Sequence, residues 1–190
     1  MDRWEYLKSQ SDYHWNPSID DTKDVRIIKN VGGNAYINEI KQIIPMQTPI
    51  IAEGEGYEGH IEQGQILYMN YTIEDDFFFP NLAYIGKQLG FNDGYVTTIQ
   101  TQTTGMNVPL HIDFAYKELV RVIVMLQDWY WGQILQFGNT VLHNWTAGDV
   151  LYWPASETPH STANLSPYSR TIAKITAKNG VNDKFMELIK

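Results

Sequence analysis

The chain of 190 residues contains no cysteine. This absence excludes a disulfide framework, a thiolate zinc site and a cysteine nucleophile, and it agrees with a reducing compartment. No apolar run is long enough to span a bilayer, and the start Met1-Asp2-Arg3-Trp4-Glu5 has no apolar signal region. We therefore expect a soluble, cytoplasmic protein without membrane contact.

Basic residues are also few, with 14 Lys and Arg against 22 Asp and Glu and a net charge of −8. Binding to a phosphate backbone depends on clustered Lys and Arg, so a nucleic-acid partner is disfavoured. Hydrophobic residues make up 43% of the chain, which is ample for one buried core and disfavours wholesale disorder. We expect a single domain over residues 1–190 that acts on small molecules or peptides, with its oligomeric state left open.

The second half of the chain consists of short runs rich in β-branched and aromatic residues. Each run is bounded by Gly, Asn, Asp or Pro, as is typical of strands separated by turns. The runs are residues 95–101, 119–126, 133–137 and 149–153. Closely spaced strands of this kind predict a sandwich or barrel.

The first half predicts elements that support this β core. Strands are expected at residues 24–28 and 65–69, and apolar residues at helical spacing predict helices at 34–44 and 76–89. Pro80 stands near the start of the second helix and Gly90 at its end. We thus expect supporting elements in 1–92, a β core in 93–178 and a closing helix at 181–189.

His111 and Asp113 stand one residue apart in the run 108–114, and His160 follows 49 positions after His111. In an extended strand, alternate side chains share a face, so His111 and Asp113 can aim at one point. A second strand-borne histidine would complete a facial triad that leaves open positions on Fe(II). The alternative is a solvated loop end that carries the pair by chance.

With this context, the segment from about Tyr95 to Lys178 resembles the core of the Fe(II)- and 2-oxoglutarate-dependent oxygenases, especially the prolyl-hydroxylase-like members. In that family a His-x-Asp pair opens the core, a Gly-Asp-hydrophobic strand leads to the distal histidine, and a basic residue follows about ten positions later. The matching residues are His111, Asp113, Gly148-Asp149-Val150-Leu151, His160 and Arg170. The resemblance implies a mainly β fold, a cupin-like double-stranded β-helix or jelly roll, buttressed by N-terminal helices.

The resemblance also implies an activity. The metal triad His111, Asp113 and His160 would bind Fe(II), and Arg170 would offer its planar guanidinium to the far carboxylate of 2-oxoglutarate. In the family, 2-oxoglutarate and O2 are consumed, succinate and CO2 are released, and a C–H bond is hydroxylated. Peptidyl proline is the first expected substrate, with a free amino acid or other small metabolite close behind.

The chain departs from the family pattern around the cosubstrate. Many members have a hydroxyl donor two residues after the basic residue, where this chain has Ile172. Thr171 should point to the other strand face. The positions that match the tyrosines near 2-oxoglutarate in prolyl hydroxylases are Thr101 and Met125, which we expect beside the cosubstrate.

Three residues are candidates for substrate binding. Arg121 should share a strand face with Ile123 and Met125. If that face points inward, Arg121 is a second cation in the pocket; otherwise it is a charge at the edge or end of its strand. Trp129 and Trp131 follow a strand and are expected to wall the pocket, because flat aromatic rings grip a ligand with little loss of rotamer freedom.

Two other function classes stay open. In a cupin-like binding or metal-sensing module, the same triad would hold a metal without oxidation, and in a structural jelly roll, as in virion proteins, the triad would be coincidental. Halogenases of this fold need a vacant coordination site, and Asp113 occupies that position. Arg170 favours the oxygenase, because a metal holder has no need of a carboxylate clamp at that spacing.

Overall fold

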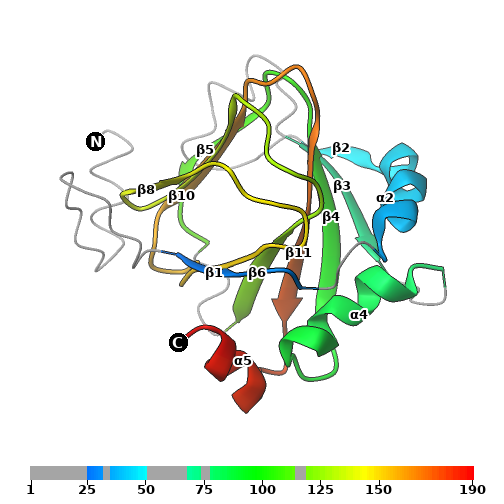
Figure 1. The fold of residues 1–190 in the computed structure, drawn as a ribbon, viewed down its shortest axis with the longest axis vertical. Coiled ribbons are helices and arrows are strands. Elements are labelled where there is room, and N and C mark those ends of the chain that lie inside the picture. Colours follow the sequence, from blue (N-terminus) through cyan, green and yellow to red (C-terminus); the bar gives the residue numbers. More distant parts are fainter. Residues whose placement is uncertain (1–24, 32–34, 51–67, 74–77, 114–118) are drawn as a thin grey trace.

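A computed structural model of the chain describes residues 25–31, 35–50, 68–73, 78–113 and 119–190. The strands are β1 (Arg26–Ile28), β2 (Thr48–Ile50), β3 (Tyr68–Ile73), β4 (Val96–Gln102), β5 (Asn107–His111), β6 (Val120–Met125), β7 (Gln133–Phe137), β8 (Thr140–Leu142), β9 (Val150–Tyr152), β10 (His160–Asn164) and β11 (Arg170–Ala177). The helices are α2 (Ile37–Ile43), the short 3-10 helix η2 (Ile44–Met46), α4 (Pro80–Leu89) and α5 (Asp183–Leu188) (Figure 1). None of these described helices is long and apolar enough to cross a membrane.

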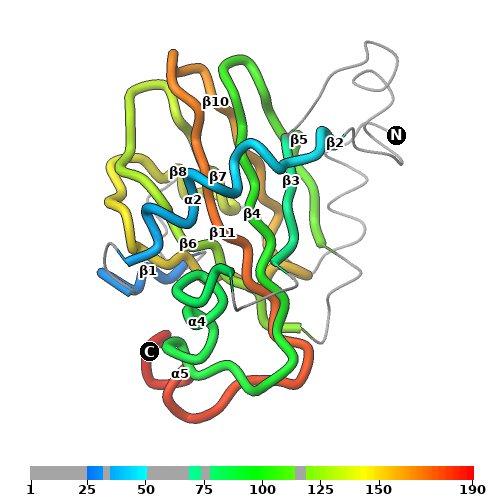
Figure 2. Tube along the Cα trace, turned by 90° about the vertical axis from the view of Figure 1, so that its right-hand side faces the viewer, coloured from blue at the N-terminus to red at the C-terminus, as the bar shows by residue number. Residues whose placement is uncertain are grey.

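The strands form two antiparallel sheets. The large sheet has seven strands in the order β1-β9-β6-β11-β4-β3-β2, and the small sheet has four in the order β5-β10-β7-β8. Neighbours such as β11 and β4 are far apart in the sequence, so long crossovers between the sheets build the fold. The arrangement is a jelly roll, with the small sheet on one side of the large sheet and the helices α2 and α4 on the other (Figures 1 and 2).

Period-two alternation in the central strands explains the two cores. On β6, Val122 and Val124 pack in the cluster that includes residues of α2 and α4, whereas Ile123 and Met125 pack in the cluster between the sheets. Alternate residues of a strand point to opposite faces, and a sheet covered on both faces needs apolar residues at both parities. The inter-sheet cluster continues through Ile172 on β11, so apolar packing lies next to the candidate site.

Helix α4 is fixed to α2 through its first turn. Pro80 begins the helix, and the backbone N–H of Leu82 donates to the buried carboxylate of Glu39 at 2.9 Å. A carboxylate at a helix N-terminus satisfies N–H groups that have no partner in the helix and stabilises the positive end of the helix dipole. Gly90 ends the helix with a φ of 89°, a left-handed conformation that favours glycine, as its position in the sequence predicted.

The Gly-Asp turn before β9 has a structural role. Gly148 adopts a φ of 89°, and the carboxylate of Asp149 accepts from the backbone N–H of Thr146 at 3.0 Å and from Lys29 Nζ at 2.7 Å. Asp149 thereby ties the turn to the residue that follows β1. This explains the presence of Gly and Asp ahead of a hydrophobic strand without any contact to the cavity.

The predicted elements agree with the structure in type and differ at their ends. The predicted helix 34–44 begins at Ile37, and the predicted strand 65–69 is the start of β3, whose described part runs from Tyr68 to Ile73. The three-residue strands β2 and β8 were not predicted. Residues 24, 34, 65–67 and 76–77 of the predicted elements, and 1–23 of the predicted supporting region, lie outside the described residues.

Candidate metal centre

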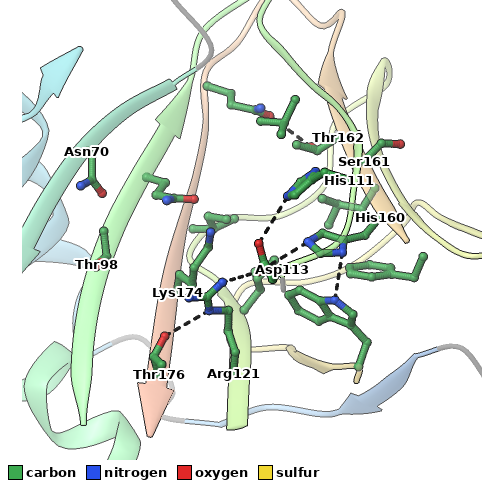
Figure 3. A pocket seen from close by; sticks show the side chains of 18 of the residues that line it. Asn70, Thr98, His111, Asp113, Arg121, His160, Ser161, Thr162, Lys174 and Thr176 are labelled. Atoms are coloured by element: carbon green, nitrogen blue, oxygen red, sulfur yellow. Dashed lines mark hydrogen bonds and ion pairs between the residues drawn. The ribbon is translucent and has the colours of Figure 1, made fainter. Parts of the chain in front are cut away.

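A cavity of about 550 Å³ lies between the two sheets. Its walls come from alternate residues of the central strands, and on β11 these are Arg170, Ile172, Lys174 and Thr176. The small sheet contributes residues of β5, β7 and β10 from the opposite side (Figure 3). A volume in this range suits a small-molecule site.

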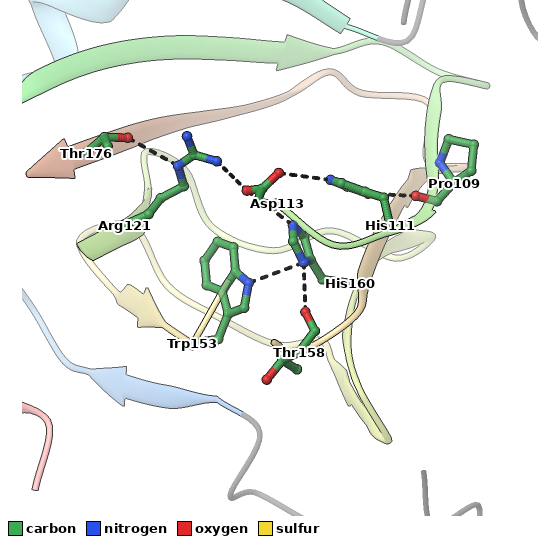
Figure 4. A network of polar contacts seen from close by, with 8 residues as sticks. All are labelled: Pro109, His111, Asp113, Arg121, Trp153, Thr158, His160 and Thr176. Carbon is green, nitrogen blue, oxygen red and sulfur yellow. Dashed lines mark hydrogen bonds and ion pairs between the residues drawn. The ribbon is translucent and has the colours of Figure 1, made fainter. Parts of the chain in front are cut away.

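His111, Asp113 and His160 meet in this cavity. The register of β5 and β10 pairs His160 with His111, and Asp113 follows two residues after the end of β5. Asp113 Oδ1 lies 3.6 Å from His111 Nε2, and Asp113 Oδ2 lies 3.7 Å from His160 Nε2 (Figure 4). The candidate ligand atoms of the three residues all lie within 4.8 Å of one another. Donors about 2.1 Å from a shared ion stand about 3 to 4 Å apart, so this set fits one divalent metal.

Backbone carbonyls orient both imidazole rings. His111 Nδ1 lies 2.8 Å from the carbonyl oxygen of Pro109, and His160 Nδ1 lies 3.1 Å from that of Thr158. A proton on Nδ1 suits a carbonyl acceptor and leaves Nε2 as the lone-pair donor that faces Asp113. Trp153 Nε1 also approaches His160 Nδ1, at 3.3 Å, but the Thr158 carbonyl is nearer and sets the tautomer that metal binding needs.

The electrostatics of the triad favour a cation. Burial raises the pKa of Asp113, but the charges of His160, Lys174, Arg121 and His111 outweigh burial and bring its pKa down to about 2. Burial, together with repulsion from His111, lowers the pKa of His160 to about 3. At neutral pH, Asp113 is therefore ionised and His160 is neutral, which are the protonation states that ligate a metal.

The depressed pKa of His160 predicts how the stability of the metal-free protein depends on pH. In the unfolded chain, histidine gains a proton below about pH 6.5, whereas folded His160 stays neutral down to about pH 3. The unfolded state then binds more protons, so the free energy of unfolding decreases as the pH falls through this window. Between pH 7 and 5, His160 should account for a loss of about 2 kcal/mol, measured by urea denaturation. His160→Asn should remove this share, and the exposed His143→Asn is the matched control. Equal pH slopes in the native protein and His160→Asn would contradict the assignment.

Arg170 is buried at one end of the cavity without a carboxylate partner. Its side chain is 1% exposed, Nη1 donates to the carbonyl of Ile134 at 3.0 Å, and Nη2 contacts the side-chain oxygens of Gln102 and Thr162. Among the described residues, no carboxylate lies within ion-pair distance of this guanidinium. Arg170 Nε and Gln102 Nε2 are buried donors with no partner in the described part of the chain, and burial lowers the pKa of Arg170 to about 9. Unused donors beside an uncompensated buried charge fit an anionic ligand.

Arg121 faces the cavity and contacts the triad. Its Nη1 donates to Asp113 Oδ2, and its Nε donates to Thr176 Oγ1 at 3.1 Å (Figure 4). The guanidinium thus orients the carboxylate from behind, as partners of metal ligands commonly do. Lys174 also lines the cavity, and sequence reasoning missed it. Its even spacing from Arg170 on one strand was the signal that could have revealed it.

The other four candidates do not line the cavity. Thr101 lies on the opposite face of the large sheet, where its hydroxyl is 2.9 Å from that of Thr171. Met125 is fully buried in the inter-sheet core. Trp129 Nε1 donates to the carbonyl of Gln133 at 2.8 Å, and its ring centroid is 5.0 Å from that of Trp131, which is 77% exposed. The structure therefore brings none of these side chains to the triad.

Comparison with solved structures supports the fold. The chain is similar to a prolyl-4-hydroxylase from Pseudomonas putida, with a TM-score of 0.54 and 14% identity over 76% of this chain and 84% of that one. It is also similar to SnoN, a non-heme alpha-ketoglutarate-dependent epimerase from nogalamycin biosynthesis, with a TM-score of 0.55 and 13% identity over 80% and 76% of the two chains. No protein-family model matches the sequence, and no curated protein matches it. Identities this low show the fold alone, and they confirm the predicted double-stranded β-helix.

Proposed function

We propose that this chain is an Fe(II)- and 2-oxoglutarate-dependent dioxygenase that hydroxylates a small molecule or a peptidyl residue. One observation carries the proposal. The cavity that holds the metal-ligand triad also holds Arg170, a buried guanidinium with an unused Nε and no carboxylate partner among the described residues. A site that only held a metal would bury this charge at a cost and without a purpose. The names of the two similar structures, a hydroxylase and an alpha-ketoglutarate-dependent epimerase, agree with this chemistry.

Each part of the cavity would have a distinct task. His111, Asp113 and His160 would hold the iron from one side, so that its remaining positions face the cavity. Iron, 2-oxoglutarate and O2, when bound, supply the oxidising power. Arg170 and Gln102 would hold the far carboxylate of 2-oxoglutarate through charge-assisted hydrogen bonds. Apolar neighbours such as Ile172, which lines the same wall, would exclude water.

A cupin-like module that binds a metal without oxidation is the second candidate. It is favoured by two departures from the family pattern: Ile172 stands where many oxygenases have a hydroxyl donor, and neither Thr101 nor Met125 lines the cavity. The module would use the same triad. Only the consumption of 2-oxoglutarate separates the two functions.

The test is succinate formation by the native protein. Protein loaded anaerobically with Fe(II) and 2-oxoglutarate would be mixed with pools of amino acids, organic acids and peptides, and air would then be admitted. We expect succinate that depends on Fe(II), on O2 and on the protein, and that increases with at least one pool. Zn(II) in place of Fe(II) is the control, because it fills the site without redox chemistry. Metal binding with no succinate above the Zn(II) control would favour the cupin-like module.

A further inference from the structure

The end of the cavity away from Arg170 is also cationic. Lys174 and Thr176 lie four and six residues after Arg170 on the same face of β11, and four residues of strand span about 13 Å. Arg121 reaches this end through its contact with Thr176. Figure 3 shows Lys174 next to Arg121, whose guanidinium contacts Asp113. Cationic side chains therefore lie at both ends of the cavity, on either side of the candidate metal centre.

The charge of the cavity contrasts with that of the chain. The described residues that line it include four cationic side chains, Arg121, Arg170, Lys174 and the exposed Lys178, against one carboxylate, Asp113. The whole chain carries a net charge of −8. A cationic cavity in an acidic protein concentrates anions, because low-dielectric walls focus the field.

Lys174 has no partner of its own among the described residues. Within the described part of the chain, no hydrogen bond or ion pair reaches its Nζ, although it lies in the field of Asp113. Burial lowers the pKa of this amine to about 8, Asp113 counteracts part of that effect, and Arg121 adds to it. A half-buried amine in this setting would be stabilised by an anion that none of the described residues provides.

Metal binding would increase the need for that anion. A divalent ion held by Asp113 would use the negative charge that now offsets Lys174 and Arg121, leaving two cations beside the metal. The far carboxylate of 2-oxoglutarate would occupy the Arg170 end. The opposite end would therefore require a second anionic group from another molecule.

We propose that Lys174, together with Arg121, binds an anionic group of the prime substrate, which is therefore a small organic acid. This inference rests on the proposed function, and it narrows the substrate class from small molecules and peptidyl residues to small organic acids. Polar neighbours agree with such a ligand. Thr98 and Thr176 line this part of the cavity. The buried Asn70 Oδ1 has no hydrogen bond to any described residue and could accept one from an amino or hydroxyl group of the acid (Figure 3). The anion is a carboxylate or a phosphate, and the two are separated by experiment.

The test measures binding without turnover. Protein loaded anaerobically with Zn(II) and saturating 2-oxoglutarate would be titrated calorimetrically with free L-amino acids and 2-hydroxy acids, with their primary amides, and with O-phospho-L-serine and inorganic phosphate. We expect at least one acid to bind, and its amide to bind at least about tenfold more weakly, because a hydrogen bond to a charged group is lost. Tighter binding of O-phospho-L-serine than of serine would identify the anion as phosphate, and the reverse order would identify a carboxylate.

Variants of Lys174 test whether its positive charge is responsible for the binding of the acid. Lys174→Met should weaken binding of the acid at least about tenfold, whereas Lys174→Arg, which keeps the charge, should restore most of the affinity. Lys41→Met removes the same charge from an exposed position on α2 and is the matched control. Thermal unfolding of each variant would establish that it is folded.

Three outcomes would overturn the inference. They are amides that bind as tightly as the acids, a Lys174→Met protein that keeps native affinity for the acid, and a Lys174→Met protein whose affinity for 2-oxoglutarate falls as much as that of an Arg170 variant. The last result would place Lys174 in the cosubstrate site. Failure of the proposed function gives a different result. A protein that binds the acid through Lys174 but forms no succinate with Fe(II) would have the anion subsite without the oxygenase activity.

Discussion

Replacing Arg170 by Met is expected to weaken the binding of 2-oxoglutarate by about thirtyfold to several thousandfold. A desolvated, charge-assisted contact of this kind contributes about 2 to 5 kcal/mol, and the variant has no other cation at this end of the cavity among the described lining residues. Metal affinity should change little, because Arg170 contacts Gln102, Thr162 and Ile134 and none of the triad. Anaerobic calorimetry on Zn(II)-loaded protein measures both affinities.

Two comparisons make the result specific to a carboxylate clamp. Arg170→Lys keeps the charge but loses the planar fork, so its affinity for 2-oxoglutarate should lie between those of the native protein and Arg170→Met. Arg170→Met also removes a buried charge and its hydrogen bonds to Gln102 and Thr162, so the free energy of unfolding must be measured for both variants. Native affinity for 2-oxoglutarate in a folded Arg170→Met protein would transfer the role to Arg121 or Lys174.

The fold was predictable where the chain alternates in long runs. The strands β4, β6, β7 and β9 were found because β-branched and aromatic residues fill them, and the resemblance to a known family indicated how such strands pair. The strands β2 and β8 were missed because three residues are too few to show a period, whereas the equally short β9 lies inside the longer apolar and aromatic run 149–153. Register also lies beyond the sequence, since it depends on pairing between strands such as β11 and β4 that are about seventy residues apart.

The same limits explain the outcome for the site. The triad could be named because two candidate ligands stand one residue apart near a strand end, and a Gly-Asp-hydrophobic strand leads to the third in the family that the chain resembles. The face of Arg121 was undecided until the register placed it opposite Thr176, whose neighbour on the same face is Lys174. A register shift of one residue decides whether a side chain faces the cavity. Thr101 pairs with Thr171 rather than with Arg170, so it points away from the cavity. The directions of Trp129 and Trp131 depend on a loop whose geometry no spacing rule gives.

The second large effect is expected at Asp113. Asp113→Asn should weaken metal binding by at least about a hundredfold and remove succinate formation above the Zn(II) control. Loss of an outer partner of a metal ligand alone costs up to about a hundredfold, so loss of the only charged ligand should cost no less. Asn keeps the size of the side chain and an oxygen that Arg121 can contact, which is why it is preferable to Ala.

Because Asp113 also forms an ion pair with Arg121, Asp113→Ala should lower the stability of the protein as well as its metal affinity. Removing the carboxylate breaks an ion pair whose side chains are only 13% and 5% exposed, and breaking a buried pair in this way costs about 3 to 5 kcal/mol. A loss of activity in Asp113→Ala could then come from unfolding, so urea denaturation must accompany it. Asp93→Asn, at a position that is 90% exposed, removes the same charge away from the cavity and is the matched control. If folded Asp113→Asn bound Zn(II) as tightly as the native protein, Asp113 would be excluded as a ligand, and with it the facial triad on which the oxygenase depends.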